Sequence, residues 1–393
     1  MFLVREWTTT WDAVVVGAGP AGAVAAQRLA QCGKSVLLVD AKSFPRKKIC
    51  GGCLNGRALQ LLSECDLVSV LADADAVPLS KMRLACGLQT AHWDLAGGVV
   101  LNRSRFDAAL VRRAEDSGVQ FIDEATALVM PESRPIVRRI EVRCHGQVVS
   151  IDARMVLVAD GLTRSSLKRL AEFESGVEPS SRIGIGTHFV DNSRDFAAGS
   201  LTMAVADAGY AGIVRTADGG TTIAAAVDTA ALRSTSSPGE LVARILDHCR
   251  LPVPEALHSA EWQGTAQLTR MNRQTASDRL LVLGDAIGYV EPFTGEGMAW
   301  AMSSALLAVP LSLDVIEGRD VDLSAAWKRI LQQRVFREQW TCRLLTRLLR
   351  SPRLTSWSLA ICRQIPWLPR RVIAQVNGRS RLGRTAIRGG ASV

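Results

Sequence analysis

Three glycines near the N-terminus have the spacing of a turn that binds the phosphates of a dinucleotide. Gly17, Gly19 and Gly22 follow a short β-branched run at 12–16, and a helix-forming segment continues to about Gln31. In such a unit the first glycine allows a tight turn, the second lets the backbone approach a pyrophosphate, and the third lets the helix pack close to the strand. The helix N-terminus adds unpaired N–H groups and the positive end of its dipole. The pattern therefore predicts a β–α–β unit that holds a dinucleotide.

An acidic residue stands where such a site needs one. Asp40 ends a second apolar run, 35–39, and lies 18 residues after Gly22. This is close to the spacing at which a carboxylate binds a ribose hydroxyl, whereas an arginine there would accompany a 2′-phosphate. Asp40 therefore predicts FAD or NAD, rather than NADP, as the bound dinucleotide.

Two further acids end apolar runs later in the chain. The run 155–159 is followed by Asp160-Gly161, and the run 280–283 by Gly284-Asp285. Because open α/β sheets bind ligands at the carboxyl ends of their parallel strands, we expect both acids at one ligand site. Downstream, Gly295-Glu296-Gly297 opens an apolar helix whose N–H groups and dipole would stabilise negative charge on a reduced flavin. These segments favour FAD over NAD.

Together these segments resemble a known group of flavoproteins. The chain is similar to the p-hydroxybenzoate-hydroxylase-type FAD-dependent oxidoreductases, a superfamily related to flavin monooxygenases and flavin halogenases, and within it to the geranylgeranyl reductase family. The resemblance rests on Gly17–Gly22 with Asp40, Arg103-x-x-Phe106-Asp107, Asp160-Gly161, Pro45-Arg46-Lys47-Lys48-Ile49-Cys50-Gly51-Gly52, and Gly284-Asp285 followed by Glu291-Pro292-Phe293-Thr294-Gly295-Glu296-Gly297-Met298. It spans residues 12–300, and no motif of the family matches the chain past about residue 325.

The resemblance implies roles for individual residues. Arg103 would lie near the FAD phosphates or ribityl chain, Asp285 would bind the ribityl hydroxyls, and Cys50 would lie against the flavin face near the substrate. The expected catalytic residues are Cys50, Gly51, Gly52 and Tyr210. The expected cofactor contacts are Gly17, Gly19, Pro20, Ala21, Gly22, Asp40, Ala41, Arg103, Asp160, Gly161, Gly284, Asp285, Pro292, Gly295, Glu296, Gly297 and Met298. No metal site is expected.

The chain departs from the superfamily in the part that would contact the substrate. Gly288 stands where flavin hydroxylases usually have a histidine, and the tryptophan motif of the tryptophan halogenases is missing. The Tyr-x-Trp-x-Phe-Pro motif of geranylgeranyl reductases is reduced to Tyr210, with Gly212, Val214 and Arg215 at its other three positions. A changed substrate is the simplest explanation.

The pattern along the chain predicts an α/β fold. We expect a doubly wound, Rossmann-like FAD-binding domain, an inserted antiparallel β-sheet domain for the substrate, and a helical C-terminus. Strands are expected at 183–190, 201–205, 212–216 and 221–227, with a hairpin turn at 218–220. The expected divisions are 1–75, 98–175 and 270–325 for the FAD-binding domain, 76–97 and 176–269 for the substrate domain, and 326–393 for the basic C-terminal region.

Several of these residues have a second interpretation. Cys50 and Cys53 form a C-x-x-C pair that could exchange electrons with FAD, but a glycine-rich loop carrying two thiols is favoured. Glu296 fits a helix-start acid better than a catalytic acid. His188 fits a core or surface histidine better than an acid–base catalyst. The nine cysteines show no repeated spacing, so reduced thiols are expected.

The C-terminal part of the chain is strongly basic. From Trp327 onward there are fifteen lysines and arginines against one acid, so this part carries a net charge of +14 and the rest of the chain −5. Apolar side chains at helical spacing in 325–349 predict an amphipathic helix packed on the body. Peripheral binding to anionic lipid, with Trp340, Trp357 and Trp367 at the interface, is the second interpretation. Nucleic-acid binding is not expected, because no recognition motif accompanies the charge.

The remaining patterns bear on location. Charges at Arg5 and Glu6 argue against a secretory signal, so we expect a cytoplasmic protein, membrane-associated if its tail binds lipid. The longest uncharged run, the 17 residues between Glu296 and Asp314, predicts a buried helix rather than a membrane span.

The residues and the resemblance together predict a FAD-dependent oxidoreductase that acts on a hydrophobic small molecule. The favoured reaction is reduction of a carbon–carbon double bond in an isoprenoid-like, polyketide-like or lipid-like substrate by hydride from reduced FAD. NAD(P)H would visit the flavin transiently, or a separate reductase would supply electrons, because no second dinucleotide motif is visible. A FAD-dependent monooxygenase of an aromatic or polyketide substrate is the alternative, and a non-catalytic FAD-binding or electron-transfer protein is the second alternative.

Overall fold

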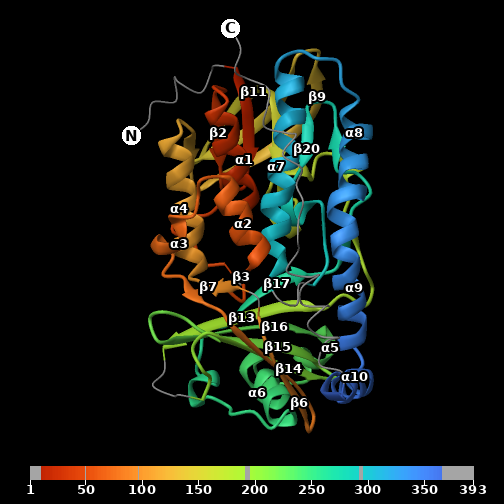
Figure 1. Ribbon diagram of the computed structural model, residues 1–393. Helices are drawn as coiled ribbons and strands as arrows, with labels where there is room; N and C mark the ends of the chain where they lie inside the picture. Colours follow the sequence, from red (N-terminus) through yellow and green to blue (C-terminus); the bar gives the residue numbers. More distant parts are fainter. Residues whose placement is uncertain (1–9, 49, 96, 191–194, 292–294, 365–393) are drawn as a thin grey trace.

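The chain forms two layers, each built around a large β-sheet, and a helical arm runs along both (Figure 1). The computed structural model describes residues 10–364 except 49, 96, 191–194 and 292–294. Pro292, Trp367 and the rest of the basic tail from residue 365 therefore lie outside the described residues. The predicted α/β fold with a second sheet and a helical C-terminal region is confirmed. The exact domain boundaries stay a prediction.

An eight-stranded mixed sheet forms the first layer. Its main order is β19 (Ala276–Ser277), β20 (Leu280–Val282), β11 (Gln147–Val158), β1 (Trp11–Val16), β2 (Val36–Val39) and β8 (Gln120–Ile122), and the antiparallel strands β10 (Val137–Cys144) and β9 (Ala125–Arg134) extend from β11. From β20 to β8 the neighbouring strands are parallel. Val16 is opposite Val158 and Val39, so the segments that follow three of these strands meet at one sheet edge.

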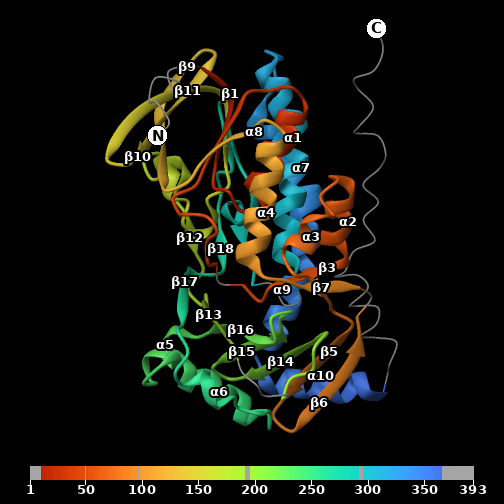
Figure 2. The same cartoon turned by 90° about the vertical axis from the view of Figure 1, so that its left-hand side faces the viewer.

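Helices cover one face of this sheet, and antiparallel strands cover the other (Figure 2). The helical face carries α1 (Pro20–Gln31), α4 (Arg103–Asp116) and α7 (Glu296–Ile316), with α2 (Gly56–Glu64) and α3 (Val70–Asp73) beside them. Strands β9 and β10 pack on the opposite face. Among the described residues, α7 alone is long and apolar enough to cross a membrane, but 67% of its most apolar stretch is buried within the protein. It is therefore a core helix, as predicted.

A seven-stranded sheet forms the second layer. Its order is β17 (Gln263–Gln267), β13 (Ile183–Val190), β16 (Gly220–Val227), β15 (Gly209–Arg215), β14 (Ser200–Ala206), β5 (Lys81–Cys86) and β6 (Gln89–Asp94). All neighbours are antiparallel except β14 and β5. Helix α6 (Pro238–His248), with α5 (Thr229–Arg233) beside it, covers the outer face. The inner face is turned toward the first layer.

Two small three-stranded sheets complete the β-structure of the described residues, and one strand begins earlier than predicted. The small sheets are β3 (Cys53–Asn55), β7 (Gly98–Val100) and β4 (Val77–Pro78), and β12 (Gly176–Val177), β18 (Arg270–Met271) and β21 (Gly288–Tyr289). The strand expected at 212–216 begins earlier, at Gly209. Gly209 has a φ of +145°, and a Cβ there would lie 2.2 Å from the Ala226 carbonyl oxygen, so only glycine allows this strand to start so close to β16. Tyr210 consequently lies within β15.

The helical arm links the two layers. It comprises α8 (Leu323–Ile330), a π-helical stretch at Leu331–Phe336, α9 (Arg337–Leu349) and α10 (Pro352–Gln364). Trp327 of α8 is fully buried in the core of the first layer. Helix α9 then continues along the edge of the molecule, and α10 crosses the seven-stranded sheet beside β6, β5 and β14 (Figure 1). The predicted packing of this segment on the body is confirmed for the described residues.

Candidate functional site

The glycine turn after β1 leaves a helix N-terminus open to a cavity. Gly17 has a φ of +100°, and a Cβ at Gly22 would lie 1.8 Å from the Gly17 carbonyl oxygen, so neither position accepts a larger residue. The N-cap of α1, Gly19, provides no side-chain cap, and the first turn holds no acid. Gly19, Pro20 and Ala21 line the cavity. The N–H groups of this helix start are thus available to an anion.

Asp40 orients the same turn. Its carboxylate accepts hydrogen bonds from the backbone N–H of Ala18 at 2.8 Å and of Lys42 at 2.9 Å. Together with Ala41, Asp160 and Gly161, it lines a second cavity of about 400 Å³ next to the first. One oxygen of Asp160 accepts the Ser166 N–H at 2.8 Å, and the other has no hydrogen-bond partner among the described residues. Burial raises the pKa of Asp160.

A chain of alternating charges surrounds the glycine turn. Arg103 makes a bidentate, buried ion pair with Asp107, with nitrogen–oxygen distances of 2.9–3.1 Å. Arg46 lies between two acids, 3.5 Å from Asp107 and 3.7 Å from Asp40, and its guanidinium lies 3.2 Å from where a Cβ of Gly19 would be. The buried Nε of Arg46 has no hydrogen-bond partner among the described residues. These cations suit a diphosphate beside α1.

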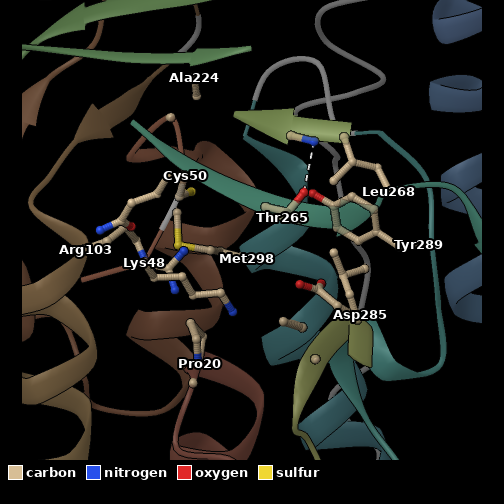
Figure 3. A pocket seen from close by; sticks show the side chains of 18 of the residues that line it. Pro20, Lys48, Cys50, Arg103, Ala224, Thr265, Leu268, Asp285, Tyr289 and Met298 are labelled. Atoms are coloured by element: carbon tan, nitrogen blue, oxygen red, sulfur yellow. Dashed lines mark hydrogen bonds between the residues drawn. The ribbon is translucent and has the colours of Figure 1, made fainter. Parts of the chain in front are cut away.

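The main cavity, about 1060 Å³ in volume, lies between the two layers (Figure 3). Pro20 of α1 lies at one end and Ala224 of β16 at the other, with Cys50 and Met298 on one side and Tyr289 on the opposite side. From the first layer it is lined by the start of α1, the loop before β3, Arg103, the segment after β11, the segment after β20 and the start of α7. Residues of β13–β17 line it from the second layer.

Lys48 and Asp285 bring opposite charges into this cavity. Burial lowers the pKa of Lys48, and the nearby Asp285 carboxylate opposes that shift. Burial raises the pKa of Asp285, and Lys48 and Arg103 oppose it. For Arg103, burial would lower the pKa, but Asp107 and the neighbouring Cys50 sulfur outweigh it and raise the pKa. Lys48 belongs to the family motif quoted above, but the sequence analysis did not predict that it would lie near Asp285.

The start of α7 lies against the loop that carries the cysteines. Gly295 has a φ of +90°, and a Cβ there would lie 2.6 Å from the Cys53 carbonyl oxygen. Gly295, Gly297 and Met298 line the cavity, whereas Glu296 is buried in the first turn of the helix. Gly284 and Asp285 line the same cavity. The described members of the predicted cofactor set thus line the two neighbouring cavities, apart from Gly22 and Glu296, which line neither.

None of the nine cysteines, all of which lie in the described residues, forms a disulfide. Burial, with Cys50 and Glu296 nearby, raises the pKa of Cys53, and its Sγ lies 3.4 Å from the Gly51 carbonyl oxygen. A thiol held protonated in this way is a poor nucleophile for disulfide exchange. The geometry thus favours the glycine-rich loop over a redox-active cysteine pair.

The two tyrosines of the chain both line the cavity. Tyr210 lies on β15 and was predicted, while Tyr289 follows Gly288 and was missed. The one feature of the sequence that could have pointed to Tyr289 is that the chain has only two tyrosines. Burial raises both pKa values well above the ordinary range, so both hydroxyls remain protonated at neutral pH. His188 lies elsewhere, on β13, where its ring contacts Asp218 of the β15–β16 turn at 3.2 Å and Thr222 of β16 at 3.0 Å.

Comparison with known proteins agrees with this geometry. A family model described as FAD binding domain matches residues 10–321. The chain belongs to the FAD-binding domain family. It is a FAD-dependent oxidoreductase, and the residues present fit the cofactor. An uncapped helix start lines the main cavity, and Arg46 and Asp160, each with a buried polar atom that has no hydrogen-bond partner among the described residues, line both cavities.

Several curated proteins are similar over most of their length. The menaquinone reductase of Mycobacterium tuberculosis is 28% identical over 364 residues, which is 87% of this chain and 85% of that protein. Digeranylgeranylglycerophospholipid reductase 1 of Methanococcoides burtonii is 26% identical over 340 residues, covering 84% and 79%. The predicted resemblance to geranylgeranyl reductases is thereby confirmed as a similarity.

Solved structures show the same fold. A flavin-dependent brominase superposes with a TM-score of 0.79 at 19% identity, over 94% of both chains. A geranylgeranyl bacteriochlorophyll reductase-like protein from Thermoplasma acidophilum superposes with a TM-score of 0.72 at 19% identity, over 87% of this chain and 88% of that one. At this identity, the likeness concerns the fold alone.

Proposed function

We propose that this flavoprotein reduces a carbon–carbon double bond in an isoprenoid-like, polyketide-like or lipid-like substrate. The observation that carries the proposal is how charge is divided within the cavity. Its charged lining residues come from the first layer: Lys42, Arg46, Lys47, Lys48, Arg103, Asp160 and Asp285. The lining residues from the seven-stranded sheet carry no charge and include Ile185, Leu201 and Met203. The polar half suits the cofactor, and the uncharged half suits an apolar chain.

The flavin half follows from the cavity residues. We propose that Gly17, Gly19, Pro20, Ala21 and Gly22, with Asp40, Ala41 and Arg103, hold the ADP part of FAD. Asp160, Gly161, Gly284, Asp285, Gly295, Glu296, Gly297 and Met298 hold the remainder. The bound flavin supplies a hydride, and a proton completes the reduction of the double bond.

The loop Cys50-Gly51-Gly52 separates the two halves. A Cβ at Gly51 would lie 3.9 Å from the Ala224 methyl group on β16, which is ordinary van der Waals contact, so the gap between loop and sheet has room for one methyl group and little more. Gly52 has a φ of +65°, and a Cβ there would lie 2.7 Å from the Leu101 carbonyl oxygen. Gly52 therefore lets the loop approach the core closely, whereas Gly51 lies opposite the sheet with ordinary contact distance to spare. Cys50 faces the cavity from this loop.

Proton donors are available beside the substrate half. Cys50, Tyr210 and Tyr289 line the cavity, and the raised pKa values of the tyrosines keep their protons in place. Arg182, fully buried, lies over the Tyr210 ring at 5.8 Å and pairs with Asp228 at 3.1 Å, which fixes the position of the ring. We propose Cys50 and Tyr210 as the catalytic side chains on this face.

The names of the relatives narrow the substrate class. Menaquinone and digeranylgeranylglycerophospholipid are the molecules in the names of the two curated relatives described above. We infer that a lipid with an unsaturated isoprenoid chain is the substrate class to test first. NAD(P)H visiting the flavin transiently, or a separate reductase, is the proposed electron source. Cysteines that form no disulfide suit a cytoplasmic protein.

The experiment that tests this function identifies the product. FAD-loaded protein is incubated with NADPH or NADH and a panel of isoprenoid lipids, and the lipids are analysed by mass spectrometry. A gain of two hydrogens in one lipid class supports the proposal, and Cys50→Ala or Tyr210→Phe should slow it while FAD stays bound. A gain of an oxygen atom would instead establish the monooxygenase alternative.

A further inference from the structure

The outer side of the helical arm exposes large apolar side chains. Trp340 and Leu344 are 62% and 44% exposed on α9, and Leu354 and Trp357 are 53% and 70% exposed on α10. Trp340 and Leu344 are four residues apart and share one helix face. Trp340 and Trp357 are the only exposed tryptophans among the described residues. Such side chains are costly to leave in water unless something covers them.

The inner side of the same helices packs on a cluster of apolar residues that also lines the cavity, here called the cavity cluster. Leu349 of α9 and Leu359 of α10 belong to one apolar cluster with Leu201, Met203 and Tyr210 of the seven-stranded sheet. Those three residues also line the cavity. Contacts of the α10 start confirm the position, since the Cys86 Sγ at the end of β5 lies 3.4 Å from the Pro352 carbonyl oxygen. The apolar cluster is therefore continuous from the cavity to the back of the exposed face.

Unpaired cations accompany the exposed apolar residues. Arg337 and Arg347 precede and follow Trp340 and Leu344 at helical spacing, and Arg353 adjoins Leu354. All three are exposed, and none has an ion-pair partner among the described residues. The acid of α9, Glu338, pairs with Arg57 at 3.4 Å on the inner side. The outer face thus carries positive charge and tryptophan together, the composition of a surface that lies in the headgroup region of an anionic membrane.

We propose that the outer face of α9 and α10 binds the surface of a bilayer that contains anionic phospholipid. The partner is a lipid surface rather than a protein, because tryptophan and arginine interleave along both helices and no acidic side chain interrupts their outer side. This inference rests on the proposed function in one respect: an isoprenoid lipid is located in the membrane, and the bound face adjoins the cavity cluster that would receive it.

Vesicle flotation tests the proposal without any substrate. Full-length, FAD-loaded protein is mixed with phosphatidylcholine vesicles, with or without phosphatidylglycerol, and floated on a density gradient. Wild-type protein should float with the anionic vesicles and remain behind with the neutral ones. The double variants Trp340→Ala/Trp357→Ala and Arg337→Glu/Arg347→Glu should each lower the partition coefficient by more than about tenfold.

Matched controls separate this face from the rest of the molecule. Val68→Ser and Arg112→Glu remove an exposed apolar residue and reverse an exposed charge near α3 and α4, at the opposite edge (Figure 1), and both should float like wild type. Thermal unfolding and flavin absorbance establish that each variant is folded. Wild-type protein that fails to float, or face variants that float like wild type, would overturn the proposal. Either result leaves the reductase proposal standing, because no turnover is measured.

Discussion

Arg350, at the end of α9, donates a hydrogen bond to the buried carboxylate of Glu291 at 3.0 Å. Glu291 is fully buried, and its carbonyl oxygen accepts a hydrogen bond from Thr346 of the same helix at 3.2 Å. Since Glu291 precedes the start of α7 by only a few residues, the helical arm is fastened to the segment that leads into the flavin-side helix. The same arm carries the proposed membrane face.

This ion pair predicts an asymmetric effect of mutation. Arg350→Met leaves the Glu291 carboxylate buried without a cation, and it should lower the free energy of unfolding by about 3 kcal/mol. Glu291→Gln keeps a hydrogen-bonding group and should cost less. Denaturant unfolding of the FAD-loaded protein measures both changes. The double variant should be more stable than the sum of the single losses indicates, and strict additivity would show that the pair is not coupled.

The gap between Gly51 and Ala224 predicts a size limit at this point of the cavity. Gly51→Ala places a methyl group in ordinary contact with Ala224 and should leave activity nearly unchanged. Gly51→Val pushes two further methyl groups into the gap, and overpacking of about 1–3 kcal/mol should lower kcat/KM by roughly ten- to hundredfold. Flavin content should be the same in both. Equal activity of the two variants would place the substrate elsewhere.

The cation over the glycine turn predicts a loss of cofactor affinity. Arg46→Met removes a guanidinium that lies 3.2 Å from where a Cβ of Gly19 would be. A charge-assisted hydrogen bond is worth about 1.5–3 kcal/mol, so the Kd for FAD should rise roughly ten- to hundredfold. Titration of apoprotein followed by flavin fluorescence measures this. Arg105→Met, which removes the surface ion pair with Asp75, is the control and should bind FAD normally.

The buried thiols predict a loss of stability at high pH. Burial raises the pKa of Cys65 from 9.0 to about 11. Below pH 9 the thiol is protonated in both the folded and unfolded states, so its contribution is fully present. As pH rises from 9 to 11 the unfolded state loses the proton first, and up to about 2.7 kcal/mol of stability is lost.

Denaturant unfolding between pH 7 and pH 11 tests that contribution. The quantity compared is the slope of the free energy of unfolding against pH. Cys65→Ala should show a shallower fall in stability with pH than wild type, because one buried thiol is gone. Cys32→Ala, at an exposed cysteine, should keep the wild-type slope. A Cys65→Ala slope equal to that of wild type would contradict the assignment.

The sequence was sufficient to predict those parts of the site in which a local rule constrains the backbone. Gly17 and Gly22 can be identified because no side chain fits the turn, and the acids after the parallel strands can be identified because strand ends converge at a sheet edge. The uncharged inner face of the second sheet was also foreseeable from its few charges. These features depend on spacing within a few residues of each motif.

Long-range partners were not foreseeable in the same way. Arg46 contacts Asp107, Lys48 lies near Asp285, and Arg350 pairs with Glu291 across 59 residues, and no periodicity encodes these distances. Tyr289 lies in the segment 284–297, where the sequence analysis interpreted the glycines and acids and assigned the tyrosine no role. The early start of β15 at Gly209 depends on Ala226 of the neighbouring strand, so it too is a tertiary effect.

The most direct test of the central claim is a single turnover without oxygen. The bound FAD is reduced with a limiting amount of dithionite, an isoprenoid lipid is added, and flavin absorbance and lipid mass are followed together. The account predicts that the oxidised flavin spectrum returns as one double bond per flavin gains two hydrogens, and that Gly51→Val slows both changes together. A flavin that stays reduced until oxygen is admitted, with oxygen then appearing in the lipid, would contradict it.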